Sequence, residues 1–134
     1  MLKDSAVKTT LPATLYRMSP LLVVSDLKRS IEFYTGPLGF ELNFEHGGFY
    51  AGLGIGPHSI HLKVGTPSNS ERQRRLENED VDLIFGVKDL DGLYEQVCSQ
   101  ALEIVQPLRV IPYGREFYVR DPDGHVLAFF DVTS

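Results

Sequence analysis

The spacing of hydrophobic and polar positions along this chain changes from a strand-like to a helix-like pattern. This change occurs twice, in the same order. Leu21 to Val24 and Val81 to Val87 are short apolar runs of the kind that form buried strands. After the first run, Leu27, Ile31 and Tyr34 recur at helical spacing. The pattern therefore predicts a strand followed by a helix near the start of each half of the chain.

The helix of the second half is predicted by one apolar stripe, which consists of Leu90, Leu93, Tyr94, Val97, Cys98 and Ala101. Cys98 lies on this stripe and has no activating partner nearby in the sequence. We therefore expect Cys98 to be a small residue of the core and not a nucleophile.

An internal repeat links the two halves. Val24-Ser25-Asp26-Leu27 and Val87-Lys88-Asp89-Leu90 match at an offset of 63 residues. Each match places an aspartate at the start of a predicted helix, where its carboxylate can accept hydrogen bonds from free backbone amides and interact favourably with the helix dipole. The chain is thus a duplication of one unit.

Three more strands are predicted in each half, which gives a strand-helix-strand-strand-strand order. They cover Gly39 to Glu45, Phe49 to Leu53 and Ser59 to Val64, then Leu102 to Val110, Arg115 to Arg120 and His125 to Val132. Asp121-Pro122-Asp123-Gly124 joins the last two strands as a turn, in which proline fixes φ and glycine closes the loop. We divide the chain into an arm (1–17), a first module (18–64), a polar linker (65–80) and a second module (81–134), all within one compact domain.

Composition and charge narrow the possible partners. Of 134 residues, 43% are hydrophobic and 23% charged, which is typical of a globular protein, and no apolar run approaches the length of a membrane span. A net charge of -5 argues against nucleic acid and favours a cationic ligand. The single cysteine cannot form a disulfide within the chain, so we expect a cytoplasmic protein.

Two stretches carry a resemblance to a known superfamily: Pro20 to Leu27, which continues through the first helix to Phe40, and Gly114 to Gly124. They resemble the vicinal-oxygen-chelate superfamily, which includes glyoxalase lyases, extradiol dioxygenases, fosfomycin-resistance enzymes and bleomycin-resistance proteins. The resemblance implies the glyoxalase/bleomycin resistance fold, an α+β fold whose two βαβββ modules form a curved mixed sheet around a groove.

The proline that opens the first strand, Pro20, and the run Gly114-Arg115-Glu116-Phe117 look most like the bleomycin-resistance branch. That branch implies a homodimer whose grooves, lined by both chains, sequester the drug without chemistry. The modules can pair within one chain or between two chains, and the sequence leaves both arrangements open.

Enzymes of the superfamily hold a divalent metal through four strand positions, and the resemblance places these positions at Ser19, His61, Asp82 and Ala128. Alanine cannot bind a metal, and catalytic zinc or iron typically needs three protein ligands. We therefore expect no metal cofactor. If zinc, nickel or iron does bind, His61 and Asp82 are the usable donors.

The period-2 pattern of a strand sorts the candidate groove residues by face. In the strand 59–64, Ile60 and Leu62 would face the helix and His61 would face the groove. The same parity and the aromatic positions give a candidate ligand-binding set of Ser19, Leu21, Phe49, His61, Asp82, Ile84, Tyr113, Ala128 and Phe130.

Other polar residues are expected to be structural. His46, His58 and His125 lie at predicted turns and would be solvated. Arg115 and Glu116 would form an ion pair beside the last hairpin.

Three functions remain in view. The first, which we favour, is a dimeric, non-catalytic protein that binds a small cationic or aromatic molecule, with antibiotic resistance by sequestration as the named example. The second is a metal-dependent lyase, isomerase or dioxygenase of the glyoxalase type, so that the sequence leaves it uncertain whether the chain is an enzyme. The third is a dimeric scaffold that binds no small molecule.

Overall fold

The computed structural model describes residues 14–66, 68–77 and 80–132. Most of the predicted arm therefore lies outside the described residues. Within the described ranges, no helix has both the length and the apolar composition to cross a membrane.

Two units of the same strand and helix order follow one another. The first contains β1 (Leu21–Val24), α2 (Leu27–Thr35), β2 (Glu41–His46), β3 (Tyr50–Ile55) and β4 (His58–Val64). Helix α3 (Asn69–Glu77) comes next, and the second unit contains β5 (Leu83–Gly86), α4 (Leu90–Ser99), β6 (Glu103–Ile111), β7 (Gly114–Arg120) and β8 (Val126–Val132). The α+β class and the duplicated order predicted from the sequence are confirmed.

Each unit forms one mixed sheet of four strands. Sheet 1 has the order β1-β4-β3-β2 and sheet 2 the order β5-β8-β7-β6. The strand before each helix pairs in parallel with the last strand of its unit, and the other neighbours are antiparallel. Among the described residues, the edge strands are β1 and β2 in sheet 1, and β5 and β6 in sheet 2.

Both predicted aspartate caps are present. The Asp26 carboxylate accepts a hydrogen bond from the Arg29 amide, and the Asp89 carboxylate accepts one from the Gly92 amide, each at 3.1 Å. These bonds satisfy amides that have no partner inside the helix, so they fix where α2 and α4 begin.

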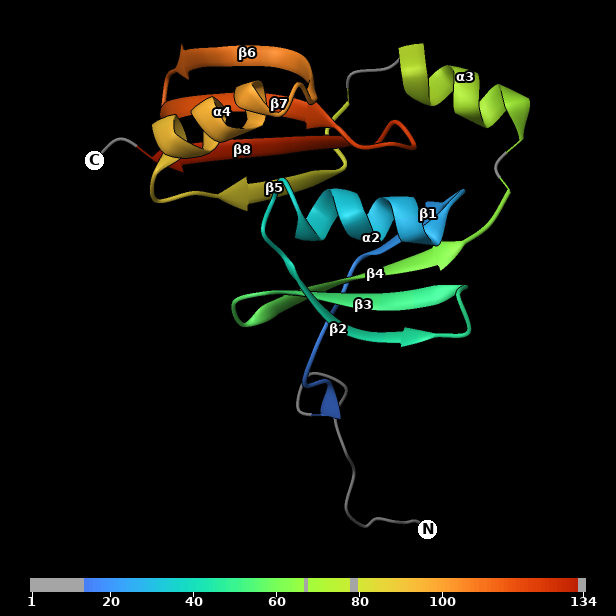
Figure 1. Cartoon of the computed structure of the whole chain (residues 1–134). Helices are drawn as coiled ribbons and strands as arrows, with labels where there is room; N and C mark the ends of the chain where they lie inside the picture. The colour runs from blue at the N-terminus through green and yellow to red at the C-terminus, as the bar shows by residue number, and fades with distance from the viewer. Residues whose placement is uncertain (1–13, 67, 78–79, 133–134) are drawn as a thin grey trace, which may run out of the picture.

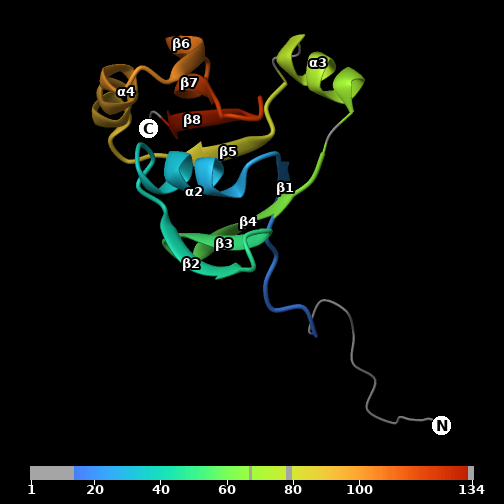
Figure 2. The ribbon, with the colours of Figure 1, turned by 45° about the vertical axis from the view of Figure 1, so that its right-hand side comes forward.

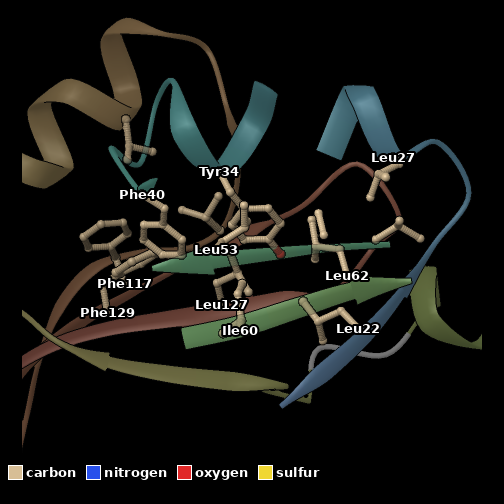
Figure 3. Close-up of a cluster of buried hydrophobic side chains, with 14 of the residues drawn as sticks. Leu22, Leu27, Tyr34, Phe40, Leu53, Ile60, Leu62, Phe117, Leu127 and Phe129 are labelled. Carbon is tan, nitrogen blue, oxygen red and sulfur yellow. The ribbon is translucent and has the colours of Figure 1, made fainter. Parts of the chain in front are cut away.

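The core lies between the two sheets, and α2 runs through the space between them (Figures 1 and 2). Figure 3 shows leucine and isoleucine side chains of sheet 1 meeting aromatic side chains of sheet 2 in this cluster. One tilted ring pair crosses between the units, with the ring centroids of Phe40 and Phe85 5.6 Å apart. Within the second unit, the Phe85 ring stacks on Phe129 at 5.1 Å between centroids. Because one face of each sheet is packed into this shared core, the other face of each sheet points away from it.

Helix α3 lies inside the segment that the sequence analysis treated as a linker. Ser68 and Glu71 form a capping box: the Glu71 amide donates to the Ser68 hydroxyl at 3.2 Å, and the Glu71 carboxylate accepts from the Ser68 amide at 3.1 Å. The helix was missed because it has no apolar stripe, although the Ser-x-x-Glu spacing was visible in the sequence.

The prediction that Cys98 belongs to the core is wrong, since its side chain is exposed. Val97 is fully buried and points from α4 toward the sheet. A helix turns by about 100° per residue, so the residue after Val97 is carried to the flank of α4.

Candidate functional site

The face of sheet 1 that points away from the core, called here the outer face of sheet 1, follows the predicted alternation. Along β1, Leu22 and Val24 are 7% and 0% exposed, whereas Leu21 and Val23 are 49% and 40% exposed. Along β4, Ile60 and Leu62 are buried and His61 is half-buried on the opposite side. The outer face therefore presents exposed apolar side chains beside a histidine.

His61 belongs to an aromatic group on this face. The Tyr50 hydroxyl and His61 Nδ1 are 2.7 Å apart and form a hydrogen bond, which leaves Nε2 of the same ring for another partner. The Phe44 ring meets His61 edge-on at 5.5 Å and stacks on Tyr50 at 6.2 Å. Gly52 makes this packing possible, because a Cβ there would collide with the Phe44 ring.

The outer face of sheet 2 carries a different group, centred on Glu116. Two guanidinium nitrogens of Arg109 donate to Glu116 Oε2, at 2.9 and 2.6 Å, and the Tyr118 hydroxyl donates to the same oxygen at 3.1 Å. Burial and the neighbouring Glu116 carboxylate raise the pKa of Tyr118 above its ordinary value, so the phenol stays protonated and remains a donor.

A cavity of about 210 Å³ opens beside this group. Its lining consists of Val81, Ile84, Tyr113, Glu116, Tyr118, Ala128 and Phe130. Four of the predicted site residues, Ile84, Tyr113, Ala128 and Phe130, therefore meet at one place on sheet 2.

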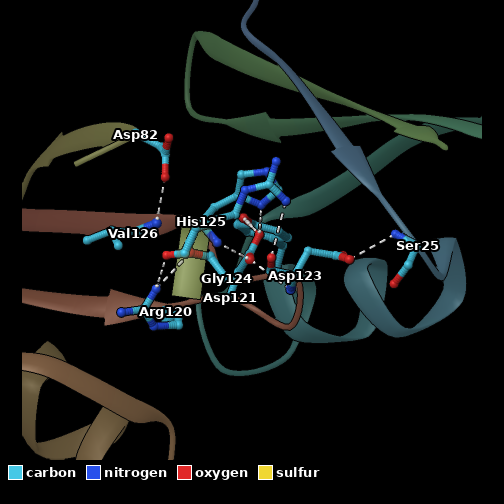
Figure 4. Close-up of polar contacts among 10 residues, drawn as sticks. Ser25, Asp82, Arg120, Asp121, Asp123, Gly124, His125 and Val126 are labelled. Carbon is cyan, nitrogen blue, oxygen red and sulfur yellow. Dashed lines mark hydrogen bonds and ion pairs between the residues drawn. The ribbon is translucent and has the colours of Figure 1, made fainter. Parts of the chain in front are cut away.

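The four positions where the superfamily's enzymes bind a metal do not fit a metal here. Ala128 has no donor atom, and the Ser19 hydroxyl is hydrogen-bonded to the Ser59 hydroxyl. Asp82 Oδ2 accepts from the Val126 amide at 2.8 Å (Figure 4), so the carboxylate is tied to the start of β8. Among the described residues, no three His, Cys, Asp or Glu side chains gather closely enough to hold a metal ion.

Within one chain, the structure does not bring the predicted site residues together. Ser19, Leu21 and His61 lie with sheet 1, and Ile84, Ala128 and Phe130 lie on sheet 2, on faces that both point away from the shared core.

Phe49 does not lie on the outer face of sheet 1. It precedes β3 with the parity of the buried Ala51 and Leu53, and its ring packs beside Gly47 of the β2–β3 turn.

The predicted ion pair between Arg115 and Glu116 is wrong. The two side chains project to opposite faces of β7, as consecutive strand residues do. Arg115 bonds to Asp91 and Asp131, both at 2.9 Å, whereas Glu116 pairs with Arg109. The two carboxylates raise the pKa of Arg115 far above its ordinary value.

The prediction that His125 is solvated is also wrong. His125 is 5% exposed, and its Nδ1 lies 2.8 Å from Asp121 Oδ2, within the turn between β7 and β8 (Figure 4). The same Asp121 oxygen accepts from the Tyr34 hydroxyl of α2 at 2.7 Å, and Asp123 accepts from the Ser25 amide at 3.0 Å. These residues form what we call the turn clamp, which ties the second unit to the first.

A cavity of about 720 Å³, which the sequence does not predict, lies between the units at the other end of their interface. Residues of both units line it, among them Ile55 and His58 from the β3–β4 turn region and Lys88 and Leu93 from around the start of α4. The walls are mainly apolar.

The geometry agrees with comparisons to known proteins. The family model described as Glyoxalase/Bleomycin resistance protein/Dioxygenase superfamily matches residues 16–129. A bleomycin resistance protein of Geobacillus stearothermophilus is 30% identical, in a match that covers 83% of this chain and 92% of that protein. Bleomycin resistance proteins of Staphylococcus aureus match to the same extent.

Solved structures share the fold. The bleomycin-binding protein of Streptomyces verticillus, in complex with copper(II)-bleomycin, has a TM-score of 0.64 and 24% identity, over 89% of this chain and 98% of that one. The fosfomycin resistance protein FosX of Listeria monocytogenes has a TM-score of 0.69 and 18% identity, over 89% of this chain and 94% of that one. A similar backbone thus accompanies different activities, and the fold alone does not choose between them.

Proposed function

This chain belongs to the Glyoxalase/Bleomycin resistance protein/Dioxygenase superfamily, and from that premise we propose that it sequesters an antibiotic or a similar small molecule, without a metal, in grooves between two copies of itself. The relatives at 30% identity support a ligand-binding protein of the antibiotic-resistance type. The ligand and the groove are our proposal.

The observation that carries the proposal is the separation of the two half-sites. His61 with its aromatic neighbours lies on the outer face of sheet 1, and the Glu116 cavity lies on the outer face of sheet 2. A second copy would place its sheet 2 opposite sheet 1 of the first, so that modules 18–64 and 81–134 pair between chains. Each groove would then have one aromatic wall and one carboxylate wall.

Two of the four edge strands in the described part of the chain, β1 and β5, support the same arrangement. Strands β1 and β5 are short and apolar, and each carries an exposed side chain: Leu21 is 49% and Ile84 67% exposed. Exposed apolar edges of this kind are normally covered by a partner. Pairing β1 of one copy with β5 of the other would cover both and join the two sheets.

We place this binding in the cytoplasm and without catalysis. An exposed free thiol at Cys98 suits a reducing compartment. A glyoxalase-type or dioxygenase reaction would need a metal at the superfamily's four ligand positions. Two of these positions are Ser19 and Ala128, which give no support to such a reaction.

The arrangement of the dimer is tested by sedimentation velocity on Leu21→Lys, with Leu42→Lys as its matched control. Leu21 and Leu42 are 49% and 45% exposed, but Leu42 pairs across the sheet with the buried Leu53 and so faces the other side. Leu21→Lys should dissociate the dimer, because a charge would enter the interface, and Leu42→Lys should not. A monomeric wild-type chain, or equal effects of both changes, contradicts the proposal.

Ligand binding is tested by thermal shift on metal-free protein with bleomycin as the probe. A ligand present at 100 times its Kd stabilises the folded state by about 2.7 kcal/mol, so a clear rise in Tm is expected. Retention of stoichiometric zinc, nickel or iron that is lost in His61→Ala would instead favour the enzyme. The absence of any shift with bleomycin would remove this drug as the ligand.

A further inference from the structure

The Glu116 carboxylate is held in place by one of its two oxygens. The Arg109 and Tyr118 hydrogen bonds all end on Oε2. Among the described residues, none of the hydrogen bonds involves Oε1. Three donors on one oxygen fix the plane of the carboxylate and leave the lone pairs of the other free.

Oε1 is accessible from outside. The Glu116 side chain is 10% exposed, and the fully buried side-chain atoms that lack a partner in the described part of the chain are Ser30 Oγ and Asp131 Oδ1. Oε1 has no hydrogen-bond partner in that part of the chain and yet is not one of these buried atoms. It therefore belongs to the exposed part of the Glu116 side chain. That surface belongs to the lining of the cavity on the outer face of sheet 2.

The charged group in the lining of this cavity is a carboxylate. Glu116 is the charged residue among the seven that line it, and the counter-charge, Arg109, is not part of the lining. The Arg109 guanidinium lies 5.6 Å from the Tyr118 ring centroid, and its side chain is 45% exposed, so Arg109 holds the carboxylate from outside the cavity. The other walls are the aromatic rings of Tyr113, Tyr118 and Phe130 and small or branched aliphatic side chains.

We propose that Glu116 Oε1 accepts a charge-assisted hydrogen bond from an ammonium or amidinium group of the ligand, whose apolar or aromatic body packs against Tyr113 and Phe130. Glu116 is then a specificity-determining residue, and the bound class is an organic cation. This inference rests on the proposed function, because the cavity would be one wall of the proposed groove. Arg109 acts as a positioning residue, since it orients the carboxylate and is not part of the cavity lining. Tyr118 also orients the carboxylate, and its ring forms part of the wall.

The chemistry of the cavity explains why a cation is favoured over a neutral donor. A charged donor and an ionised acceptor form a hydrogen bond about twice as strong as a neutral pair. Aromatic faces add attraction for the same cation. An anion would meet the Glu116 carboxylate directly and be repelled.

The test uses three probes of one shape, benzamidine, benzamide and benzoate, with binding measured by titration calorimetry on the full chain. Benzamidine should bind saturably, at least about tenfold more tightly than benzamide, and benzoate should not bind. Glu116→Gln should reduce the preference for benzamidine over benzamide to about twofold or less, since the glutamine amide carries no charge.

Two further variants separate recognition from a general loss of structure or charge. Glu103→Gln removes the same charge from the neighbouring strand, where the carboxylate pairs with Arg120 outside the cavity, and it should leave benzamidine binding unchanged. Ala128→Leu keeps every charge but fills the cavity, and it should abolish binding of both benzamidine and benzamide. Far-ultraviolet circular dichroism checks that each variant is folded.

The inference is overturned if benzamidine does not bind, if benzoate binds as tightly as benzamidine, or if Glu116→Gln and Glu103→Gln have equal effects. Its failure is distinguishable from failure of the proposed function. If Glu116→Gln still binds bleomycin as tightly as wild type, the inference is contradicted and the proposed sequestration is retained. If the chain binds benzamidine through Glu116 but does not respond to bleomycin, the inference is supported and bleomycin is excluded as the ligand.

Discussion

At one end of the interface between the two modules, the β7–β8 turn packs against the start of α2, and at the other end the β3–β4 turn lies beside the start of α4. Both turns contain a glycine with positive φ, at +94° for Gly124 and +57° for Gly56. The longer turn fills its end with Asp121 and Asp123, which accept hydrogen bonds from the first module, and with His125, whose ring bonds to Asp121. The shorter turn leaves a cavity of about 720 Å³.

The two helices differ in the same direction at one buried position of the repeat. Tyr34 of α2 and Val97 of α4 stand at matching positions of the repeat, and both are fully buried. Tyr34 offers a hydroxyl to Asp121, whereas Val97 offers only methyl groups. The two units therefore share one scaffold, but one end of their interface is a polar clamp and the other end is an apolar cavity.

The largest effect is expected at Asp121, the acceptor of the turn clamp. It accepts from the Tyr34 hydroxyl, from the His125 ring and from two backbone amides of its own turn, all within 2.9 Å. Asp121→Ala leaves these buried donors without an acceptor, so we expect a loss of about 3 kcal/mol or more in the free energy of unfolding. Urea denaturation measures it. Asp121→Asn, which retains one acceptor oxygen, should lose less, and a loss below about 1 kcal/mol in Asp121→Ala would show that the clamp adds little.

A smaller effect is expected from a matched pair of histidines. His58 and His125 both stand three residues before the equivalent strand positions His61 and Ala128, yet His58 is exposed and His125 is buried. His125→Ala should cost about 2 kcal/mol, because it removes a buried hydrogen bond and leaves a void, whereas His58→Ala should stay within about 0.5 kcal/mol of wild type. Equal losses in the same urea experiment would mean that the two ends are energetically alike.

Tyr34→Phe removes a single bond of the clamp and should cost about 1 kcal/mol at neutral pH. Burial, and then the negative charge of Asp121, raise the pKa of Tyr34 well above its ordinary value of 10.0. A raised folded-state pKa means that this contribution is fully present below pH 10 and is lost as the pH rises toward the folded-state pKa, because the unfolded chain releases the proton first. The stability advantage of wild type over Tyr34→Phe should therefore shrink between about pH 10 and pH 11.5, as followed by urea denaturation. An advantage that grows with pH would contradict the assignment.

Local periodicity was enough to predict most of the scaffold. Hydrophobic spacing predicted α2 and the alternation of Ile60, His61 and Leu62, and the repeated aspartates predicted where both helices begin. These features depend on neighbours within a few positions along the chain, so one sequence contains the information. Helix α3 was missed because its nine residues bury no apolar stripe.

The polar contacts of the candidate site were harder to predict, since they depend on partners distant in the sequence or on strand register. The Tyr34–Asp121 bond joins residues 87 positions apart. The Arg109–Glu116 pair depends on the register of a hairpin that shifts twice between Ile104 and Arg109. The Tyr50–His61 bond could be predicted from the sequence, because the strand parity that places His61 on the outer face also places Tyr50 there.

The smallest effect is expected at Gly86, on β5 at the edge of the apolar cavity, where the repeat has Val23 in the first module. The nearest atoms to an added Cβ are carbons of the Phe130 ring, at 3.9 Å, so the site has room for a methyl group. Gly86→Ala should stabilise the fold by about 0.5 kcal/mol, because glycine in a strand loses more chain entropy on folding. Gly52→Ala is the contrasting change in sheet 1, where the methyl group would displace the Phe44 ring, and it should destabilise the protein. Because a dimer makes apparent stability depend on concentration, both are compared with wild type by thermal denaturation at one protein concentration. A Gly86→Ala variant less stable than wild type would mean that β5 has no space for a methyl group beside Phe130.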